Sequence, residues 1–431
     1  CNKMATRMQA AFHPLDSYHM ASKPKKQALA DGLVDAPVPE LLAPAGDLTA
    51  GLVALDAGAD AVYCGLRRFS ARERTENLSV EDLGRLCVRA HRDGKRVYLA
   101  VNTLVKESEL PDVRDLLASV RGTGVDALIV QDLGVLRLIR DAFPSYTVHA
   151  STQTGSHNSA AVNLLADRGV SRVILQRQIP LDELRPLVRN SRIGVEVFCH
   201  GALCCCLSGS CLLSSWMGGW SGNRGRCKQP CRRRYFSEEG NGFFLSTCDL
   251  YTLDMLDELR RLGVAALKIE GRLRKADYVD AVVSAYRLML DSADGERQQA
   301  LGEARRILSR SYGRKWSSGF YRRDRYDGVV DAARPGVSGQ LCGRVTGTRE
   351  GGIKLEVSRR IHIGDRLRFQ LSSGDEGPSL VVTKLRVGNR EVRVARRGGT
   401  CYVGCDKNVP EGALVFRSGS GCPALSSCRA V

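Results

Sequence analysis

From Glu40 onward, short apolar runs alternate with stretches of helical length. The apolar runs have the length of single strands, and they are Glu40–Ala43, Ala61–Tyr63, Arg96–Val101, Ala127–Val130, Thr147–Ala150, Arg172–Leu175, Gly194–Phe198 and Ala266–Ile269. The stretches with apolar residues at helical spacing are Val80–Asp93, Leu110–Arg121, Asn158–Arg168, Leu181–Arg189, Tyr251–Leu262 and Lys275–Leu290. Eight strand-then-helix units predict an α/β fold, a TIM-type (β/α) barrel. A doubly wound open sheet is the alternative, and the regular number of units favours the barrel.

The alternation breaks once, between Phe198 and Leu245, where the chain is rich in Gly, Ser, Cys and Arg. A long loop without periodicity inside a compact domain is normally functional. Because this Cys-rich loop (residues 199–235) follows the seventh strand, we expect it at the carboxyl-terminal mouth of the barrel, where barrel enzymes carry out their chemistry.

The same pattern divides the chain into five parts. Residues 1–36 are expected to be a disordered lead-in, with the natural start near Met20. Residues 37–292 form the barrel, and residues 293–335 form a basic connector that contains a helix. Residues 336–417 hold short alternating runs separated by Gly and Asn, which predict a smaller antiparallel β-barrel, and residues 418–431 are a tail.

Composition narrows the possible partners. The chain of 431 residues carries a net charge of +17. Such an excess favours a polyanion such as RNA, although a solvated basic surface is the alternative. Neither a membrane-spanning run nor a signal-peptide pattern is evident, so we expect a cytoplasmic protein without a membrane partner.

Sixteen cysteines are present, and seven of them lie between Cys199 and Cys231. The strongest motif within this segment contains Cys204, Cys211, Cys227 and Cys231. Soft thiolates suit iron–sulfur clusters or zinc, and a glycine-rich loop can wrap a [4Fe–4S] cubane. Structural zinc usually takes two close cysteine pairs, whereas the first pair here is seven positions apart, so a cluster is favoured.

Three neighbouring cysteines leave the ligand set open. Cys205 and Cys206 adjoin Cys204, so the first ligand could shift by one position, and Cys199 could also bind if the loop folds back. Packing is the preferred role for these three thiols.

The Cys-rich loop also carries a family resemblance. The segment from Glu196 to Cys231 resembles the signature of the collagenase-like peptidase family U32. Further matching motifs, in the same order along the chain, are Leu42–Gly46, Asp60–Tyr63, Arg68–Arg72, Asn102–Thr103, Val130–Asp132, His149–Gln153 and Lys268–Arg272. The resemblance covers about Glu40 to Leu290.

The resemblance implies an enzyme with one of two activities. Well-understood bacterial members are RNA hydroxylases, which install 5-hydroxyuridine at the tRNA wobble position or 5-hydroxycytidine in large-subunit rRNA. They depend on the iron–sulfur assembly machinery and on prephenate. By similarity, Cys204, Cys211, Cys227 and Cys231 map to the cysteines that bind a [4Fe–4S] cluster. The family name itself implies a collagenase-like peptidase, which is the alternative function.

Polar side chains recur where the predicted strands end, and in a barrel they should share one mouth. The tip residues are Asn102, Gln131, Asp132, His149, Ser151, Thr152, Gln153, Arg177, His200, Glu270 and Arg272. Arg177 and Arg272 are candidates to clamp a dicarboxylate such as prephenate. His149 and His200 are candidates to move protons, and Gln153 and Glu270 complete the catalytic candidates. Glu270 could instead form a structural ion pair with Lys268 or Arg272.

Positive charge flanks the loop cysteines, at Arg224, Arg226, Lys228, Arg232, Arg233 and Arg234. Arg224 and Arg232, together with Asn102, are the other candidates for substrate binding. Tyr235 and Phe236 offer faces on which an extruded base could stack, although a basic loop with two core aromatic residues is the alternative.

The motifs together predict an iron–sulfur enzyme that hydroxylates C5 of a pyrimidine in RNA. Peptidase chemistry has little support, since the chain has no His-Glu-x-x-His motif and a thiolate such as Cys204 is no free nucleophile once bound to iron. A zinc-stabilised RNA-binding module is the remaining, non-catalytic alternative.

Overall fold

The structure is a computed structural model that describes residues 37–73, 76–311, 313–322, 328–333, 339–349, 351–372 and 376–419. The predicted lead-in lies outside the described residues, as does most of the predicted tail. No helix among the described residues is long and apolar enough to cross a membrane.

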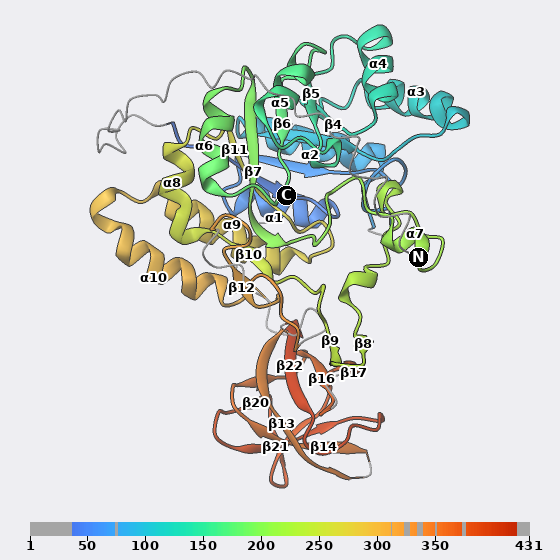
Figure 1. Ribbon diagram of the computed structural model, residues 1–431. Helices are drawn as coiled ribbons and strands as arrows, with labels where there is room; N and C mark the ends of the chain where they lie inside the picture. Colours follow the sequence, from blue (N-terminus) through green and yellow to red (C-terminus); the bar gives the residue numbers. More distant parts are fainter. Residues whose placement is uncertain are drawn as a thin grey trace, which may run out of the picture. The chain divides into compact units, whose positions relative to one another are not determined.

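Eight parallel strands close into a barrel (Figure 1), which confirms the predicted TIM-type fold. The strands are β1 (Glu40–Pro44), β2 (Ala61–Cys64), β3 (Arg96–Val101), β4 (Ala127–Val130), β5 (Val148–Ala150), β6 (Arg172–Ile174), β7 (Gly194–Ala202) and β11 (Ala266–Ile269). Neighbours in this order pair with each other, and β11 also pairs with β1, which closes the barrel.

Helices follow the strands in sequence. They are α1 (Leu48–Asp56), α2 (Val80–Arg92), α3 (Leu110–Ser119), α4 (Leu133–Ala142), α5 (Ser159–Ala166), α6 (Leu181–Arg189), α8 (Leu256–Arg261), α9 (Ala276–Asp291) and α10 (Arg297–Leu308). Helix α2 shows why they form: the Ser79 hydroxyl accepts a hydrogen bond from the Asp82 amide at 3.0 Å, and Leu83, Leu86 and Ala90 bury one face.

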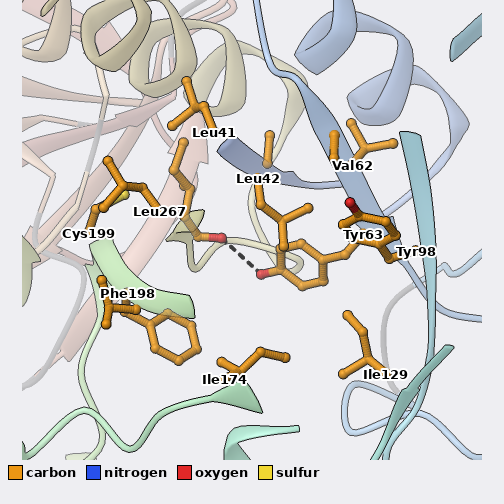
Figure 2. Packing of buried hydrophobic residues seen from close by; sticks show 14 of the residues in the cluster. Leu41, Leu42, Val62, Tyr63, Tyr98, Ile129, Ile174, Phe198, Cys199 and Leu267 are labelled. Carbon is orange, nitrogen blue, oxygen red and sulfur yellow. Dashed lines mark hydrogen bonds between the residues drawn. The ribbon is translucent and has the colours of Figure 1, made fainter. Parts of the chain in front are cut away.

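The barrel core is continuous from strand to strand. Every residue of β1 and β2 is buried, as expected for parallel strands covered on both faces. Figure 2 shows Leu42, Ile129, Ile174 and Phe198 converging from separate parts of the barrel. The Tyr63 hydroxyl, which would otherwise be unsatisfied there, donates to the Ile269 carbonyl at 2.9 Å.

Strand β7 continues past the predicted end at Phe198 to Ala202. Its extension pairs with an antiparallel strand, β10 (Asp249–Tyr251), and Ala202 lies opposite Asp249. Gly201 has a φ of 99°, and a Cβ there would come within 2.1 Å of the Glu270 carbonyl oxygen, so only glycine fits this crossing. The predicted helix Tyr251–Leu262 therefore begins later than expected, because its first residue belongs to a strand.

The segment between β7 and β10 contains short elements. They are helix α7 (Leu213–Trp216), the 3-10 turns η5 (Gly222–Arg224) and η6 (Pro230–Arg232), and a hairpin of β8 (Tyr235–Ser237) and β9 (Gly240–Gly242). A further short strand, β12 (Trp316–Ser317), pairs with β10. The remaining 3-10 turns are η3 (Glu107–Glu109), η4 (Thr152–Thr154), η7 (Leu253–Met255) and η8 (Asp294–Glu296).

The carboxyl-terminal region forms an antiparallel sheet of eight strands with its own apolar core, in agreement with the predicted fold class. In sheet order the strands are β17 (Glu376–Val381), β16 (Arg366–Gln370), β22 (Leu414–Gly419), β13 (Gln340–Arg349), β14 (Gly352–Val357), β21 (Thr400–Gly404), β18 (Leu385–Val387) and β19 (Arg390–Glu391). A separate two-stranded ladder joins β15 (Ile361–His362) to β20 (Val394–Ala395).

Candidate functional site

The first part of the Cys-rich loop is anchored by three consecutive residues that follow β6. The Gln176 side chain exchanges two hydrogen bonds with the backbone of Ser208, each at 3.0 Å, and Arg177 donates to the Ser208 hydroxyl at 3.0 Å. The Gln178 amide donates to the carbonyls of Cys204 and Cys206 at 3.0 and 3.1 Å. The loop is therefore held directly at the carboxyl end of a barrel strand.

Two glycines let the loop backbone approach the barrel closely. A Cβ on Gly209 would lie 2.0 Å from the Gln153 carbonyl oxygen, and a Cβ on Gly225 would lie 2.3 Å from the Ser70 carbonyl oxygen. Both glycines also have positive φ, at 90° and 79°. A larger residue at either position would push the loop away from the barrel mouth.

The loop and the strand tips enclose a pocket of about 250 Å³. Six cysteines line it: Cys204, Cys205, Cys206, Cys211, Cys227 and Cys231. From the barrel, Asn102, Gln153, Arg177, Glu270 and Arg272 line the same pocket. The four predicted ligand cysteines thus share one cavity with eight predicted strand-tip or substrate residues: Asn102, Ser151, Thr152, Gln153, Arg177, Arg232, Glu270 and Arg272.

The loop cysteines are thiols, since all thirteen described cysteines are free of disulfide bonds. Their sulfurs influence each other. The Cys205 thiol donates to the Cys231 sulfur, which lowers the pKa of Cys231 to about 6, with further help from Arg232 and Arg314. Burial raises the pKa of Cys227. The hydrogen bond that the Gln229 amide donates to its sulfur at 3.3 Å lowers this pKa but does not outweigh burial. The pocket therefore favours the thiolate form of Cys231.

The chemistry of this donor set fits an iron–sulfur cluster. Four cysteines in one cavity supply the soft ligands that iron–sulfur clusters take, and a cubane needs one thiolate on each iron rather than four around a single point. Within the described residues, no three His, Cys, Asp or Glu side chains surround one point closely enough to hold a single metal ion. Cys204, Cys211, Cys227 and Cys231 are the residues that would hold the cluster, with Cys205 and Cys206 beside them.

Glu270 is the acidic residue of the pocket, and it is paired with arginines. Its carboxylate contacts Arg177 at 2.8 Å and Arg72 at 3.4 Å. Burial alone would raise the pKa of Glu270, but the charges of Arg72 and Arg177 outweigh burial and hold its pKa below the usual value. The predicted ion pair of Glu270 with Lys268 is wrong, because the Lys268 ammonium pairs with Glu196 at 2.8 Å.

The pocket lining is strongly basic. Its cationic residues are Arg72, Arg177, Arg232, Lys268, Arg272 and Arg314, against the single carboxylate of Glu270 among the described residues. Arg177 lies with its guanidinium 3.7 Å from the Phe198 ring centroid, and Arg272 donates to Ser70 at 2.7 Å and to Asn77 at 2.5 Å. In the described part of the chain, the buried Nε–H groups of Arg177, Arg272 and Arg314 have no hydrogen-bond partner. The excess of cationic residues in the lining fits an anionic ligand.

The two histidines lie outside this pocket. His149 is buried among the barrel strands, its ring edge-on to Tyr98, and burial followed by the charge of Arg172 lowers its pKa to about 2. His200 lies 3.3 Å from the Tyr286 hydroxyl, and burial lowers its pKa to about 4. Both rings are therefore neutral near pH 7, and neither is placed to exchange protons with a pocket ligand.

The remaining predicted binding residues have structural partners. Arg224 does not line the pocket; it forms two hydrogen bonds to Glu109, at 2.6 and 2.9 Å, and lowers the pKa of that carboxyl to about 2. Arg232 lines the pocket while it donates to the Leu203 carbonyl at 2.7 Å and to the Thr247 hydroxyl at 2.8 Å. Both arginines fasten the loop to its surroundings. The predicted tips Gln131 and Asp132 lie elsewhere, and Asp132 caps α4.

Several site residues were missed by the sequence reasoning. Arg72 and Arg314 belong to the pocket, and Gln176 and Gln178 position the loop. Arg72 is the last residue of the motif Arg68–Arg72, which carries part of the family resemblance, so the sequence did contain a signal for this residue. Arg314 comes from the connector beyond the barrel, and its position depends on tertiary contacts that no local pattern encodes.

Comparison with known proteins identifies relatives along most of the chain. A sequence model described as Peptidase family U32 matches residues 46–330. The chain is 33% identical over 403 residues to an uncharacterized protease of Methanocaldococcus jannaschii, which covers 88% of this chain and 97% of the relative. It is 30% identical over 399 residues to the tRNA hydroxylation protein P of Escherichia coli, which covers 78% of this chain and 87% of the relative.

Two further similarities are more partial. The chain is 38% identical over 266 residues to the 23S rRNA 5-hydroxycytidine synthase of Escherichia coli, and it spans 40% of that longer protein. A solved structure of a U32 peptidase covers 42% of the chain with 12% identity and a TM-score of 0.34. The match to the family model, which extends over more than half of the sequence, confirms the resemblance inferred from the motifs: the chain belongs to peptidase family U32.

Proposed function

We propose that this chain is an iron–sulfur-dependent RNA hydroxylase that acts on C5 of a pyrimidine. The observation that carries the proposal is the single pocket in which four motif cysteines meet a cluster of arginines. The relatives named for tRNA hydroxylation and for rRNA 5-hydroxycytidine synthesis support the RNA substrate and the reaction.

Each part of the pocket has a role in the proposal. Cys204, Cys211, Cys227 and Cys231 hold a [4Fe–4S] cluster, which supplies electron transfer or Lewis acidity to the reaction. Arg177 and Arg272, which line the pocket, supply the positive charge that binds the carboxylates of a small co-substrate such as prephenate. Glu270 orients Arg177 and offsets part of the positive charge of the pocket.

The segment between β7 and β10, which carries the pocket cysteines, also exposes aromatic faces that suit an unpaired base. Trp216 on α7 is 90% exposed and Phe236 on β8 is 76% exposed, although burial of such rings is strongly favourable. The Lys228 ammonium lies 4.1 Å from the Trp220 ring centroid. Exposed aromatic faces next to cations are the surfaces on which single-stranded RNA stacks, and a pyrimidine must leave its stack before its C5 atom can react.

The first test is anaerobic purification with counts of iron and acid-labile sulfide. Four irons and four sulfides per chain, together with loss of the visible absorption in Cys204→Ala and Cys227→Ala, are expected. Cys248→Ala is the matched control, because that buried thiol lies outside the pocket. Zinc without sulfide in the wild-type protein would instead favour the RNA-binding module and remove the cluster from the proposal.

The second test is mass spectrometry of nucleosides from tRNA and rRNA of a deletion strain. Loss of 5-hydroxyuridine or 5-hydroxycytidine, restored by the wild-type gene and not by Cys204→Ala, is expected. Which nucleoside disappears identifies the RNA, and loss of modification when iron–sulfur assembly is blocked supports that machinery as a cytoplasmic partner. Unchanged nucleosides would contradict the proposal.

Peptidase activity is the second candidate, since relatives are named as a protease and as a collagenase. A thiol peptidase needs a histidine beside its cysteine, and Cys204 has no such partner in His200: Cys204 lines the pocket, whereas His200 packs against Tyr286 and Trp316. Gelatin cleavage by the cluster-free protein, abolished by Cys204→Ala, would establish this function instead.

A further inference from the structure

An arginine-rich edge lies in the carboxyl-terminal region, where two seven-residue segments run antiparallel. These segments are residues 357–363 and 393–399, and between them they contain five arginines and no Asp or Glu. The arginines are Arg359, Arg360, Arg393, Arg396 and Arg397, and all five are exposed. We call this set the arginine edge.

Backbone hydrogen bonds hold the two segments together. The ladder between β15 and β20 pairs Ile361 with Ala395. Beyond it, the Val357 amide donates to the Gly399 carbonyl at 2.9 Å, and the Gly398 amide donates to the Val357 carbonyl at 2.8 Å. The two segments are therefore held together at both ends, so their arginines lie in one small part of the surface.

Between the joints the two segments are not paired strand to strand, since the amides of Ser358 and Arg359 donate to the Cys342 carbonyl at 2.8 and 3.1 Å. The Arg360 carbonyl is also fixed, since it accepts a hydrogen bond from the Arg417 side chain at 3.2 Å. Like charges held close together repel one another, so this concentration of arginines is unfavourable unless a negatively charged partner offsets it.

No acidic side chain offsets this charge. None of the five guanidinium groups has an ion-pair partner among the described residues. Three carboxylates flank the two segments in the chain: Glu356, which lies opposite Thr400 in a ladder, Asp365, which is buried and paired with Arg417 at 3.2 Å, and Glu391, two positions before Arg393. The arginine edge is thus a concentrated, solvent-exposed cationic site.

We infer that the arginine edge binds the sugar–phosphate backbone of the RNA substrate. Guanidinium groups match phosphate oxygens in geometry and charge. Several of them gathered on one part of the surface can contact successive phosphates of an RNA strand. The identification of the polyanion as RNA rests on the proposed function, whereas the cationic site itself does not.

The test is the salt dependence of RNA binding by the full-length protein. A labelled tRNA is titrated by fluorescence anisotropy at several KCl concentrations, with the wild type and a variant in which Arg359, Arg360, Arg396 and Arg397 are replaced by Gln. The variant should bind at least about tenfold more weakly at moderate salt, and its slope of log Kd against log salt should be lower by about 3, since each lost phosphate contact removes about 0.7 to 0.9. Replacement of the same four residues by Lys should restore most of the slope.

A matched control separates local contacts from net charge. Replacement by Gln of four exposed arginines around the barrel, Arg114, Arg121, Arg168 and Arg189, removes the same total charge. This control should bind RNA nearly as the wild type does. Equal weakening by both quadruple variants, or no weakening by the first, would overturn the inference, as would a wild type that binds no RNA.

The two proposals fail in different ways. If the arginine-edge variant loses RNA affinity while the wild type leaves every pyrimidine unmodified, the RNA site stands and the hydroxylase proposal falls. If the wild type hydroxylates RNA and the variant binds RNA normally, the arginine edge is not the site. Binding to vesicles of anionic phospholipid that depends on the edge, with RNA binding unchanged, would assign the edge to a membrane surface instead.

Discussion

Glu270→Gln should have opposite effects on stability and on anion binding. The wild-type carboxylate is 13% exposed and contacts Arg177 at 2.8 Å and Arg72 at 3.4 Å. Glutamine keeps the shape of the side chain and removes the charge. The two arginines then lie in the pocket without their counter-charge, and the pocket becomes more positive by one unit.

The magnitudes follow from the geometry. Removal of one partner from a buried ion pair costs about 3–5 kcal/mol, and we expect about 3 kcal/mol because the pocket admits water. For a domain of this size that corresponds to a decrease in Tm of about 6 °C. For a bound carboxylate about 7 Å away, loss of one negative charge at an effective dielectric constant of about 20 is worth about 2 kcal/mol, so the Kd for an anion should fall more than tenfold.

Differential scanning fluorimetry with malonate, a simple dicarboxylate, measures both effects in one titration. Asp141→Asn is the control, since Asp141 pairs with Arg137 at 2.6 Å on an exposed surface where such pairs contribute less than about 1 kcal/mol. If Glu270→Gln were as stable as the wild type and bound malonate no better, the view of Glu270 as the buried counter-charge of an anion site would be wrong.

Three further predictions concern the core, pH dependence and the loop. Leu99→Ala in β3 removes a fully buried side chain and should lower the free energy of unfolding by about 2–5 kcal/mol, as measured by urea denaturation; a change below about 1 kcal/mol would contradict the core packing. The pKa of His149 is about 2 in the folded protein, so the unfolded chain binds the extra proton below about pH 6.5, and stability should fall with acidity by up to about 1.4 kcal/mol per pH unit. Unfolding of His149→Phe in urea between pH 4.5 and 7.5 should lack this component, and an unchanged pH profile would show that the ring is not buried neutral. Gly209→Ala should reduce iron content without global unfolding, whereas Gly218→Ala, whose new Cβ meets its nearest atom at 3.6 Å, should keep full iron; equal iron content in both would refute the close approach of the loop.

The barrel could be predicted because its strands are short apolar runs bounded by amphipathic helices. Strand β4 begins and ends where the sequence pattern places it, and β3 does too. Strand β10 could not be found in this way. It has three residues, and it forms because the extension of β7 offers a free edge that is distant in sequence.

The candidate site was predicted in outline and missed in detail. The cysteines and the tips of β6 and β11 meet in one pocket because parallel strands place their carboxyl ends on one side. The direction of a single tip residue depends on how far its strand extends past the rim. His200 belongs to a strand that continues to Ala202, and His149 lies before the end of β5, so both rings are buried elsewhere. The cluster, the co-substrate and the cellular location stay predictions.

The pairing of Ala202 with Asp249 has a consequence for how this barrel can diversify. Residues 203–248, which include all six pocket cysteines, leave and rejoin the barrel at positions directly opposite each other on one ladder. The pairing of Ala202 with Asp249 thus holds both ends of this segment in place, whatever its sequence. Insertions, deletions or substitutions within this segment need not shift either strand. The same barrel can therefore carry different chemistries on an unchanged fold.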